Sequence, residues 1–383
     1  MEKEITTKTS DSLIASFVPK SVRDIYLLQP DRIPGTAITG EYAALLWVDI
    51  QDFSSLSKAI LKNEKDGLEH LSLLLHEHYD PLINLISKTG GEPIFFAGDG
   101  VLCAWFSDTE DLSFEVRQAM ACGQKLIENN SLKDVEGNSV GLHVVVAAGS
   151  FHLAEVSDLE NRIFITPLGG ALKDLRNTTE TRAPGEVLLS EHVVRTISNQ
   201  FQTAPVSDKA SILNATVEPL MIELNESSDD PDNSILLPYI PVSIQYQLDS
   251  ERINWIAELR RVTVLYVSLS GFDPTTKKAA ASLRKAVKIA SKAVYHNDGI
   301  LGQVWIDEKD ANLLIYFGPP PSSHQDNPFK AIKTSVELYN ELHEAGFDVS
   351  IGVVSGTNYC GLLGNDIFRQ YTILGDNVII GSR

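Results

Sequence analysis

The sequence predicts an α+β fold built from two ferredoxin-like (βαββαβ) domains in one chain. Two observations predict it. The chain contains two copies of one pattern of strands and helices, and each copy follows the order β-α-β-β-α-β. A length of 383 residues also gives each copy enough chain to bury a core of its own.

Each copy begins with a short apolar run that is typical of a buried strand. Residues 44–53 read ALLWVDIQDF and residues 263–272 read TVLYVSLSGF, and both runs are rich in β-branched and aromatic side chains. A helix follows each strand, because apolar residues recur at steps of three and four and share one helix face. These are Leu68, Leu71, Leu75, Tyr79, Leu82 and Ile86 in the first copy, and Leu283, Val287, Ala290 and Val294 in the second.

A glycine-marked turn and a hairpin come next in each copy. The hairpins read EPIFFAGDGVLCAWF and ILGQVWIDEKDANLLIYF, and the first turns tightly through the Gly-Asp-Gly around Asp99. A second helix is expected at about residues 112–127 and 328–345. A strand then ends in small residues, VGLHVVVAAG and FDVSIGVVSG, before the closing segments ITPLGGALKDLR and YTILGDNVIIGSR.

These repeats divide the chain into two domains and a connector. The first domain covers residues 38–197, and the second covers residues 259–383. The connector, residues 198–258, is polar and is expected to be irregular and partly mobile. The first copy continues into a strand at Val187–Leu189 that the second copy lacks, so we expect a fragment or a truncated product.

Composition limits the partners and the compartment. The net charge is −19, which argues against nucleic acid or an anionic membrane as the main partner. No apolar run reaches the roughly 18 residues that span a bilayer, and no signal peptide is visible, so a cytoplasmic protein is expected. The cysteines Cys103, Cys122 and Cys360 lack metal-ligand spacing and are expected to be buried free thiols.

Two acidic residues of the first copy are candidate metal ligands. Asp49 lies at the end of the first strand and Asp99 lies in the turn of the hairpin. These elements are neighbours in a β-α-β-β unit. The carboxylates are therefore expected to converge, as a site for two magnesium ions and a triphosphate requires. The alternative is that both residues only form turns.

Several of these segments resemble the class III nucleotide cyclases, most closely the soluble adenylyl cyclases. They are VDIQDF, GGEPIFFAGDGVLCAW, SLIASFVPKSVRDIYL, WIAELRRVTVLYV, GVVSGTNYCGLLG and RQYTILGDNV, and the resemblance covers nearly the whole chain. It implies that the repeats form a head-to-tail pseudo-dimer with one composite site and one degenerate site. It also implies conversion of ATP, with GTP possible, to a cyclic nucleotide and pyrophosphate. Asp49, Ile50 and Asp99 would hold two Mg²⁺ or Mn²⁺ ions.

The resemblance assigns substrate contacts to the second repeat, and not all are kept. Gln303 stands where relatives have a lysine for the base, whereas Thr372 matches their pattern. Ile379 replaces an asparagine that orients the ribose. Arg383, the last residue, matches an arginine that contacts the phosphates and belongs to the expected catalytic set.

The first repeat also departs from the family pattern. Phe53 and Ser54 fit the triphosphate-binding segment, but Asp52 replaces its usual glycine and would either repel phosphate or point into solvent. In bicarbonate-stimulated relatives the second site uses a lysine and an arginine. Here the lysine position holds Phe95, and Arg176 is kept, so bicarbonate sensing is not expected.

Three functions remain open on the sequence. Asp49 and Asp99 favour an active adenylate cyclase, of full or weakened activity, whereas Gln303 and Ile379 favour a pseudo-cyclase that binds nucleotide and regulates. A diguanylate cyclase would begin its turn as residues 90–92 do, Gly-Gly-Glu, but the Pro-Ile that follows breaks that pattern.

Overall fold

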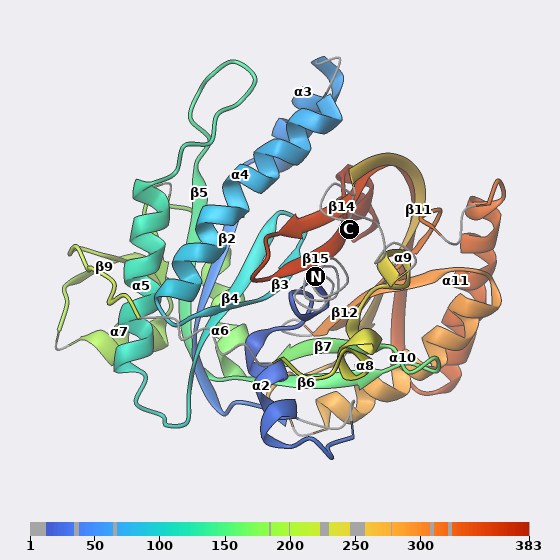
Figure 1. Cartoon of the computed structure of the whole chain (residues 1–383), viewed down its shortest axis with the longest axis horizontal. Coiled ribbons are helices and arrows are strands. Elements are labelled where there is room, and N and C mark those ends of the chain that lie inside the picture. The colour runs from blue at the N-terminus through green and yellow to red at the C-terminus, as the bar shows by residue number, and fades with distance from the viewer. Residues whose placement is uncertain are drawn as a thin grey trace, which may run out of the picture.

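The structure is a computed structural model, and it confirms the α+β class. It describes residues 13–33, 38–63, 67–183, 185–198, 200–222, 230–245, 257–276, 278–306, 310–320 and 324–382. The described residues form a seven-stranded sheet, a five-stranded sheet and a small third sheet of three strands. Figure 1 shows the two larger sheets facing each other across the middle of the molecule, with helices on their outer sides. No helix in the described part of the chain is long and apolar enough to cross a membrane.

The first repeat has the predicted ferredoxin-like order. Its sheet runs β3-β4-β2-β5, which is the ferredoxin-like arrangement, and then adds β8, β10 and β9. Neighbouring strands are antiparallel except β5 and β8. Its elements are β2 (Tyr42–Ile50), α3 (Phe53–Asn63), α4 (Gly67–Lys88), β3 (Glu92–Ala97), β4 (Gly100–Ser107), α5 (Ser113–Glu128), β5 (Leu142–Ser150), β6 (His152–Ser157), β7 (Ile163–Leu168), α6 (Gly170–Thr179), β8 (Val187–Leu189) and α7 (Glu191–Ile197).

The second repeat has the same core order, β12-β13-β11-β14-β15, and all its neighbouring strands are antiparallel. One helix, α10, stands where the first repeat has both α3 and α4. Its elements are β11 (Ala257–Ser270), α10 (Ala279–His296), β12 (Ile300–Ile306), β13 (Asp310–Phe317), α11 (Asn327–Glu344), β14 (Asp348–Gly364), β15 (Arg369–Leu374) and α12 (Asp376–Gly381).

Part of the expected connector is regular structure, so the expectation of an irregular segment is wrong there. β9 (Thr203–Ser207) and β10 (Ala210–Leu213) form a hairpin that extends the first sheet beside β8. Further on, the connector forms the short helices α8 (Asn233–Leu236), η1 (Leu237–Tyr239) and α9 (Val242–Gln245). The strands of this hairpin are short, and many of their residues are polar because one face lies in solvent. The sequence therefore gives little sign of them.

Each repeat extends an arm into the core of the other. The β6–β7 arm of the first repeat contacts α10 and β12, and the β14–β15 arm of the second contacts α4 and β3. Phe164 is part of the second repeat's core, and Phe368 is part of the first repeat's core. This reciprocal contact of the arms is consistent with the head-to-tail pairing that the family resemblance implies.

The chain before the first repeat joins both halves. In this segment, which includes β1 (Ile38–Thr39) and α2 (Lys20–Leu28), Val18 and Val22 are fully buried. The backbone N–H of Ser21 donates to Glu92 of β3 at 2.9 Å, and the carbonyl of Ser16 accepts from the N–H of Arg369 at 2.8 Å. The segment therefore bridges the strands at which the two repeats meet.

Candidate active site

A cavity of about 240 Å³ lies between the repeats and collects most of the predicted site residues. The first repeat contributes the start of α3 and the turn between β3 and β4, and the second contributes β12, β15 and α12. The predicted residues that line it are Phe53, Ser54, Asp99, Gln303, Thr372 and Ile379. The structure thus brings residues more than 300 positions apart in the sequence to one place.

The turn that carries Asp99 is held from two sides. Gly98 has a φ of 64°, a left-handed conformation that glycine adopts without steric cost. The hydroxyl of Tyr79, on α4, donates to the carbonyl of Asp99 at 2.5 Å. The backbone N–H of Ile50 donates to Asp99 Oδ2 at 3.2 Å, which places the carboxylate beside the end of β2. The predicted convergence of the two strand ends is therefore observed.

Asp49 is held by contacts that the sequence did not reveal. His143, its partner across β2 and β5, has its Nδ1 3.2 Å from Asp49 Oδ1. The His143 Nε2 lies 3.0 Å from the carbonyl oxygen of Thr181 and can donate to it. Asp49 Oδ1 is buried and has no hydrogen-bond partner among the described residues. Arg182 Nη1 lies 3.9 Å from the other oxygen, Oδ2.

The electrostatics of the pair fit a divalent cation. Burial, and then the neighbouring Asp49 carboxylate, raise the pKa of Asp99 to about 7. A cation between the carboxylates would neutralise this repulsion and would satisfy the Asp49 oxygen that lacks a donor. Among the described residues, no group of three or more His, Cys, Asp or Glu side chains is placed to hold a metal. The candidate ligands remain the two predicted carboxylates and the backbone at Ile50.

The start of α3 explains the unusual residue at position 52. Asp52 has a φ of 52°, which is why glycine suits this position, and aspartate tolerates this conformation better than most residues. Its carbonyl accepts from the N–H groups of Ser55 and Leu56 and so begins the helix. The side chain is exposed and does not line the cavity, which favours the alternative that it points into solvent. Phe53 is buried and Ser54 is half-buried at the cavity wall.

On the opposite wall, Gln303 is already engaged by the first repeat. Its Nε2 donates to the carbonyl of Phe96, in β3, at 3.2 Å. Gln370 of β15 binds the same residue twice, because its Nε2 donates to the Phe96 carbonyl at 3.1 Å and its Oε1 accepts from the Phe96 N–H at 3.0 Å. Thr372 is buried at the cavity, and Ile379 lines it with 39% of its surface exposed. Ile379 therefore faces the cavity rather than the core.

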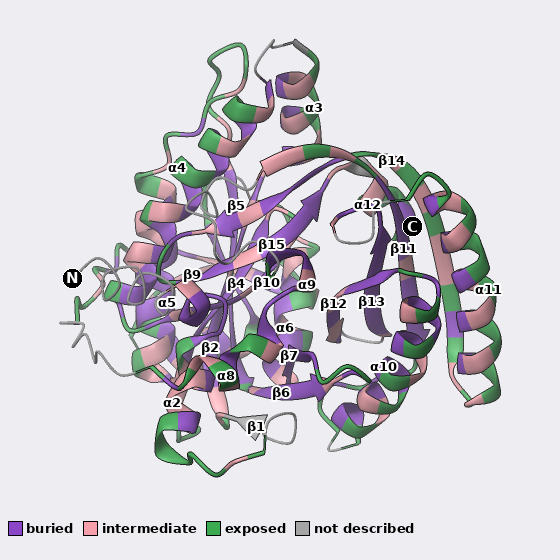
Figure 2. Ribbon diagram, turned by 45° about the vertical axis from the view of Figure 1, so that its right-hand side comes forward, coloured by how far each residue is buried: buried purple, intermediate pink, exposed green. Residues whose placement is uncertain are grey.

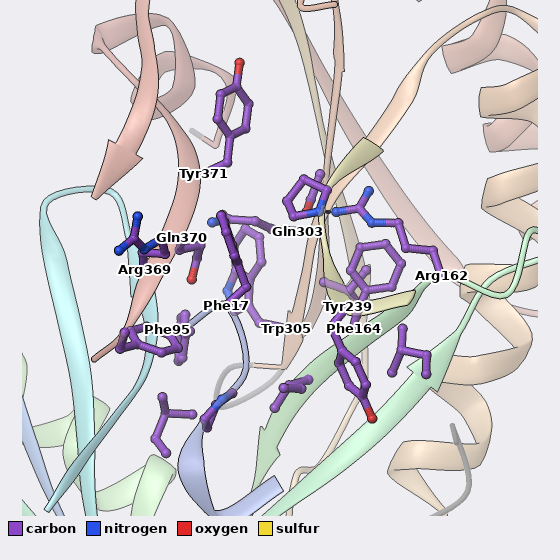
Figure 3. A pocket seen from close by; sticks show the side chains of 18 residues that line it. Phe17, Phe95, Arg162, Phe164, Tyr239, Gln303, Trp305, Arg369, Gln370 and Tyr371 are labelled. Atoms are coloured by element: carbon purple, nitrogen blue, oxygen red, sulfur yellow. Dashed lines mark hydrogen bonds between the residues drawn. The ribbon is translucent and has the colours of Figure 1, made fainter. Parts of the chain in front are cut away.

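Asp49 and Ile50 adjoin Asp99 but do not line this cavity, and three further predicted residues stand apart from it. Arg383 lies outside the described residues. Phe95 lines a second cavity of about 100 Å³, on the other side of Gln303, where Figure 3 shows Phe17 and Tyr239 among the surrounding rings. Arg176 is exposed on α6, and the described residues that line this second cavity do not include it.

Sequence reasoning missed Tyr79, His143, Arg182 and Gln370. Tyr79 fits the apolar face of α4 and was assigned only to the core. His143 opens a strand that otherwise reads as apolar, and only the register of β2 with β5 shows that it lies opposite Asp49. His143 could have been predicted from its position, because it is a polar residue near one end of a buried strand that is expected to pair with the strand ending at Asp49.

The chain has relatives among known proteins. No protein-family model matches the chain. Among curated proteins the chain is 24% identical to adenylate cyclase type 10 of Oryctolagus cuniculus over 379 residues, and 22% identical to that of Homo sapiens over 380 residues. Each alignment covers 88% of this chain and 23% of the relative, so the chain spans about a quarter of the relatives' length.

A solved structure shares the fold of both repeats. It is described as a class III adenylyl cyclase-like ATP-binding protein from Pseudomonas aeruginosa. The TM-score is 0.61 and the identity 13%, over 91% of this chain and 82% of that one. The chain therefore has the fold of a tandem pair of class III nucleotide cyclase domains. Within that class its sequence is similar over most of its length to adenylate cyclase type 10, which confirms the resemblance that the motifs indicated.

Proposed function

We propose that this chain is an adenylate cyclase that converts ATP to cyclic AMP and pyrophosphate in the cavity between its repeats. The observation that carries the proposal is the composition of that cavity. One wall holds Asp99, whose carboxylate has Asp49 as a charged neighbour behind the wall, as a cation and triphosphate need. The other wall holds Thr372 and Gln303, which can hydrogen-bond a base. GTP is the alternative substrate.

The reaction is an intramolecular displacement. The 3′ oxygen of the ribose forms a bond to the α-phosphorus, the bond from that phosphorus to the bridging oxygen breaks, and pyrophosphate leaves with the electron pair. The 3′ hydroxyl proton passes to solvent. Two Mg²⁺ or Mn²⁺ ions, bound by Asp49 and Asp99 with the Ile50 backbone, would supply charge neutralisation and activate the attacking hydroxyl.

The residues of the chain would orient and enclose the substrate. Tyr79 and the N–H of Ile50 fix the position of Asp99. The start of α3, at Phe53 and Ser54, presents backbone N–H groups and the positive end of a helix dipole to the phosphates. One N–H of the Gln303 amide donates to the carbonyl of Phe96. The second N–H of this amide and the hydroxyl of Thr372 would contact the base.

A pseudo-cyclase that binds nucleotide without turnover is the second candidate. Ile379 faces the cavity with an aliphatic side chain, which can neither donate to nor accept from the ribose. Gln303 is engaged in the interface between the repeats. The structure from Pseudomonas aeruginosa, described as an ATP-binding protein, supports the idea that this fold serves binding.

The deciding experiment incubates the pure protein with Mn·ATP or Mn·GTP and measures cyclic product by mass spectrometry. Asp99→Asn is the negative control for turnover, and binding of Mn·ATP is measured in parallel by calorimetry. Cyclic AMP from the wild type alone would support the enzyme. Binding without product would establish the regulatory candidate, and neither binding nor product would refute both.

A further inference from the structure

A cavity of about 340 Å³ lies in the first repeat, and it shares no lining residue with the cavity of the proposed active site. One wall is a face of α4, whose lining residues between positions 70 and 85 recur at helical spacing. The other wall is the end of α5 and the loop that leads to β5. Figure 2 shows both exposed and buried residues along α4. The volume is in the range of small-molecule sites.

The buried part of this cavity is apolar apart from one side chain. Its leucines have at most 9% of their surfaces exposed, and they are Leu74, Leu82, Leu126, Leu132 and Leu142. His78 lies among them and is only 8% exposed, and its Nε2 has no hydrogen-bond partner among the described residues. An unpaired buried polar atom is costly, and most such atoms in proteins are paired. The imidazole therefore indicates where a bound molecule would make a hydrogen bond.

The surroundings of His78 favour an uncharged ligand. Burial lowers the pKa of His78 to about 4, so its ring is neutral at pH 7. A neutral imidazole has one donor and one acceptor, and a hydroxyl group can pair with either. Glu77 and Lys133 also line the cavity, but both are exposed and they are opposite in sign. The Lys133 Nζ donates to Ser139 Oγ at 2.7 Å. A buried ion would therefore lose its hydration without gaining a counter-ion.

The same turn of α4 reaches the proposed active site. The ring of His78 meets that of Tyr79 edge to face, with centroids 4.8 Å apart, and the Tyr79 hydroxyl donates to the carbonyl of Asp99 at 2.5 Å. The next residue, Asp80, accepts a hydrogen bond of 2.9 Å from Asn365 of the second repeat. A molecule packed on His78 would therefore restrain the helical turn that holds Asp99.

We propose that this cavity binds a small, uncharged and mainly apolar molecule that carries a hydroxyl group, and that its binding is linked through Tyr79 to the turn of Asp99. The hydroxyl group would pair with His78, and the apolar part would pack on the leucines. The link rests on the proposed function, whereas the binding does not.

The test of binding uses 4-propylphenol as the probe and propylbenzene, which lacks only the hydroxyl group, as its match. Calorimetry on the full chain from about 10 µM to 1 mM brackets the affinities expected of ligands of this size. The wild type is expected to bind the phenol. In His78→Leu the affinity for the phenol relative to that for propylbenzene should fall at least about fivefold, because the hydroxyl group is left unpaired. Comparing two probes within one variant cancels any general change in the cavity.

Two further variants control for changes to the helix. His78→Gln keeps a donor and an acceptor and should retain most of the preference for the phenol. His76→Leu is the matched control, because His76 is exposed on α4 and does not line the cavity. No saturable binding of the phenol by the wild type, or equal effects of His78→Leu and His76→Leu on the relative affinity, would overturn the proposed site.

The link is tested by measuring Mn·ATP affinity with and without saturating 4-propylphenol. A restrained turn needs less ordering, so the phenol should raise the affinity at least about fivefold, and Mn·ATP should raise that of the phenol by the same factor. An unchanged Mn·ATP affinity would overturn the link. A protein that binds no Mn·ATP would contradict the proposed function, and binding of the phenol would still decide the site.

Discussion

The pair of carboxylates makes a quantitative prediction about Asp99→Asn in the metal-free protein. The pKa of Asp99 is raised to about 7 by burial and by Asp49, from an ordinary value near 3.8. Between these pH values the folded state keeps a proton that the unfolded state has released. Stability is therefore lost as the pH rises from about 4 to about 7, and Asp99 is a cost to the folded protein above pH 7.

The size of that cost follows from the same values. One pKa unit corresponds to about 1.4 kcal/mol, so a rise of about three units sets an upper limit near 4 kcal/mol. Asp99 is half-buried rather than fully buried, and solvent screening reduces this to roughly 2 kcal/mol. Asparagine stays neutral at every pH. The variant should therefore be more stable than the wild type by about this amount at pH 8, and by less at pH 5.

The assay is chemical denaturation of both proteins at pH 5 and pH 8, with chelator and then with Mn²⁺. At pH 8, Mn²⁺ should make the wild type more stable than the variant, because only the wild type is expected to bind the ion. Binding adds about 2.7 kcal/mol to the stability at an ion concentration a hundred times the dissociation constant. Mn·ATP binding should be lost in the variant. Asp52→Asn is the matched control, since it removes an exposed acid nearby and keeps a residue that tolerates positive φ. Equal stability of wild type and Asp99→Asn at pH 8, or unchanged Mn·ATP affinity in the variant, would show that both aspartates only form turns.

Three further predictions concern turnover, base choice and regulation. Ile379→Asn restores a polar contact of a kind that is worth on the order of 10²–10³ in rate, so we expect cyclic AMP formation to rise at least tenfold. No gain in a variant that still binds Mn·ATP would favour the regulatory role. Gln303 has one amide N–H left to donate to the base, and its amide can also accept, so we expect ATP to be preferred over GTP by only a small factor. A preference for GTP above tenfold in competition assays would contradict this prediction. Phe95 offers no charge to an anion, so bicarbonate at clamped pH should not stimulate activity, whereas a clear dose response would show that Arg176 suffices.

Most of the fold could be predicted from the sequence, because its strands and helices are regular and occur twice. The core order of both sheets follows from apolar runs such as residues 44–53 and 263–272, and the two copies corroborate each other. The β9–β10 hairpin could not be predicted, because its strands are short and half-exposed. Its place depends on pairing with β8, which no local pattern encodes.

The site was predictable where it depends on one strand end or one turn. Asp49 and Asp99 belong to this group, and so does Asp52, whose exposed side chain was one of two expected outcomes. His143 and Arg182 were not predictable, because they reach Asp49 through strand register and through the loop after α6. Gln370 was missed because it acts across the interface, on a backbone group 274 positions away.

The interface between the repeats links Gln303, a proposed base contact, to the hairpin that carries Asp99, a proposed metal ligand. β3 and β12 are edge strands of their sheets, and an uncovered edge leaves its backbone groups unpaired. Gln303 and Gln370 satisfy both backbone groups of Phe96 in β3, and Thr166 of the first repeat donates to the carbonyl of Val304 in β12 at 3.2 Å. Phe96 lies three residues before Asp99 in the same hairpin. Separating the repeats would therefore expose these backbone groups in the same hairpin that carries the Asp99 turn. In the proposed function, a lysine at position 303 would be available to the base, but Gln370 alone would then bind Phe96 across the interface. Gln303 instead binds Phe96 and so helps to keep the two repeats together.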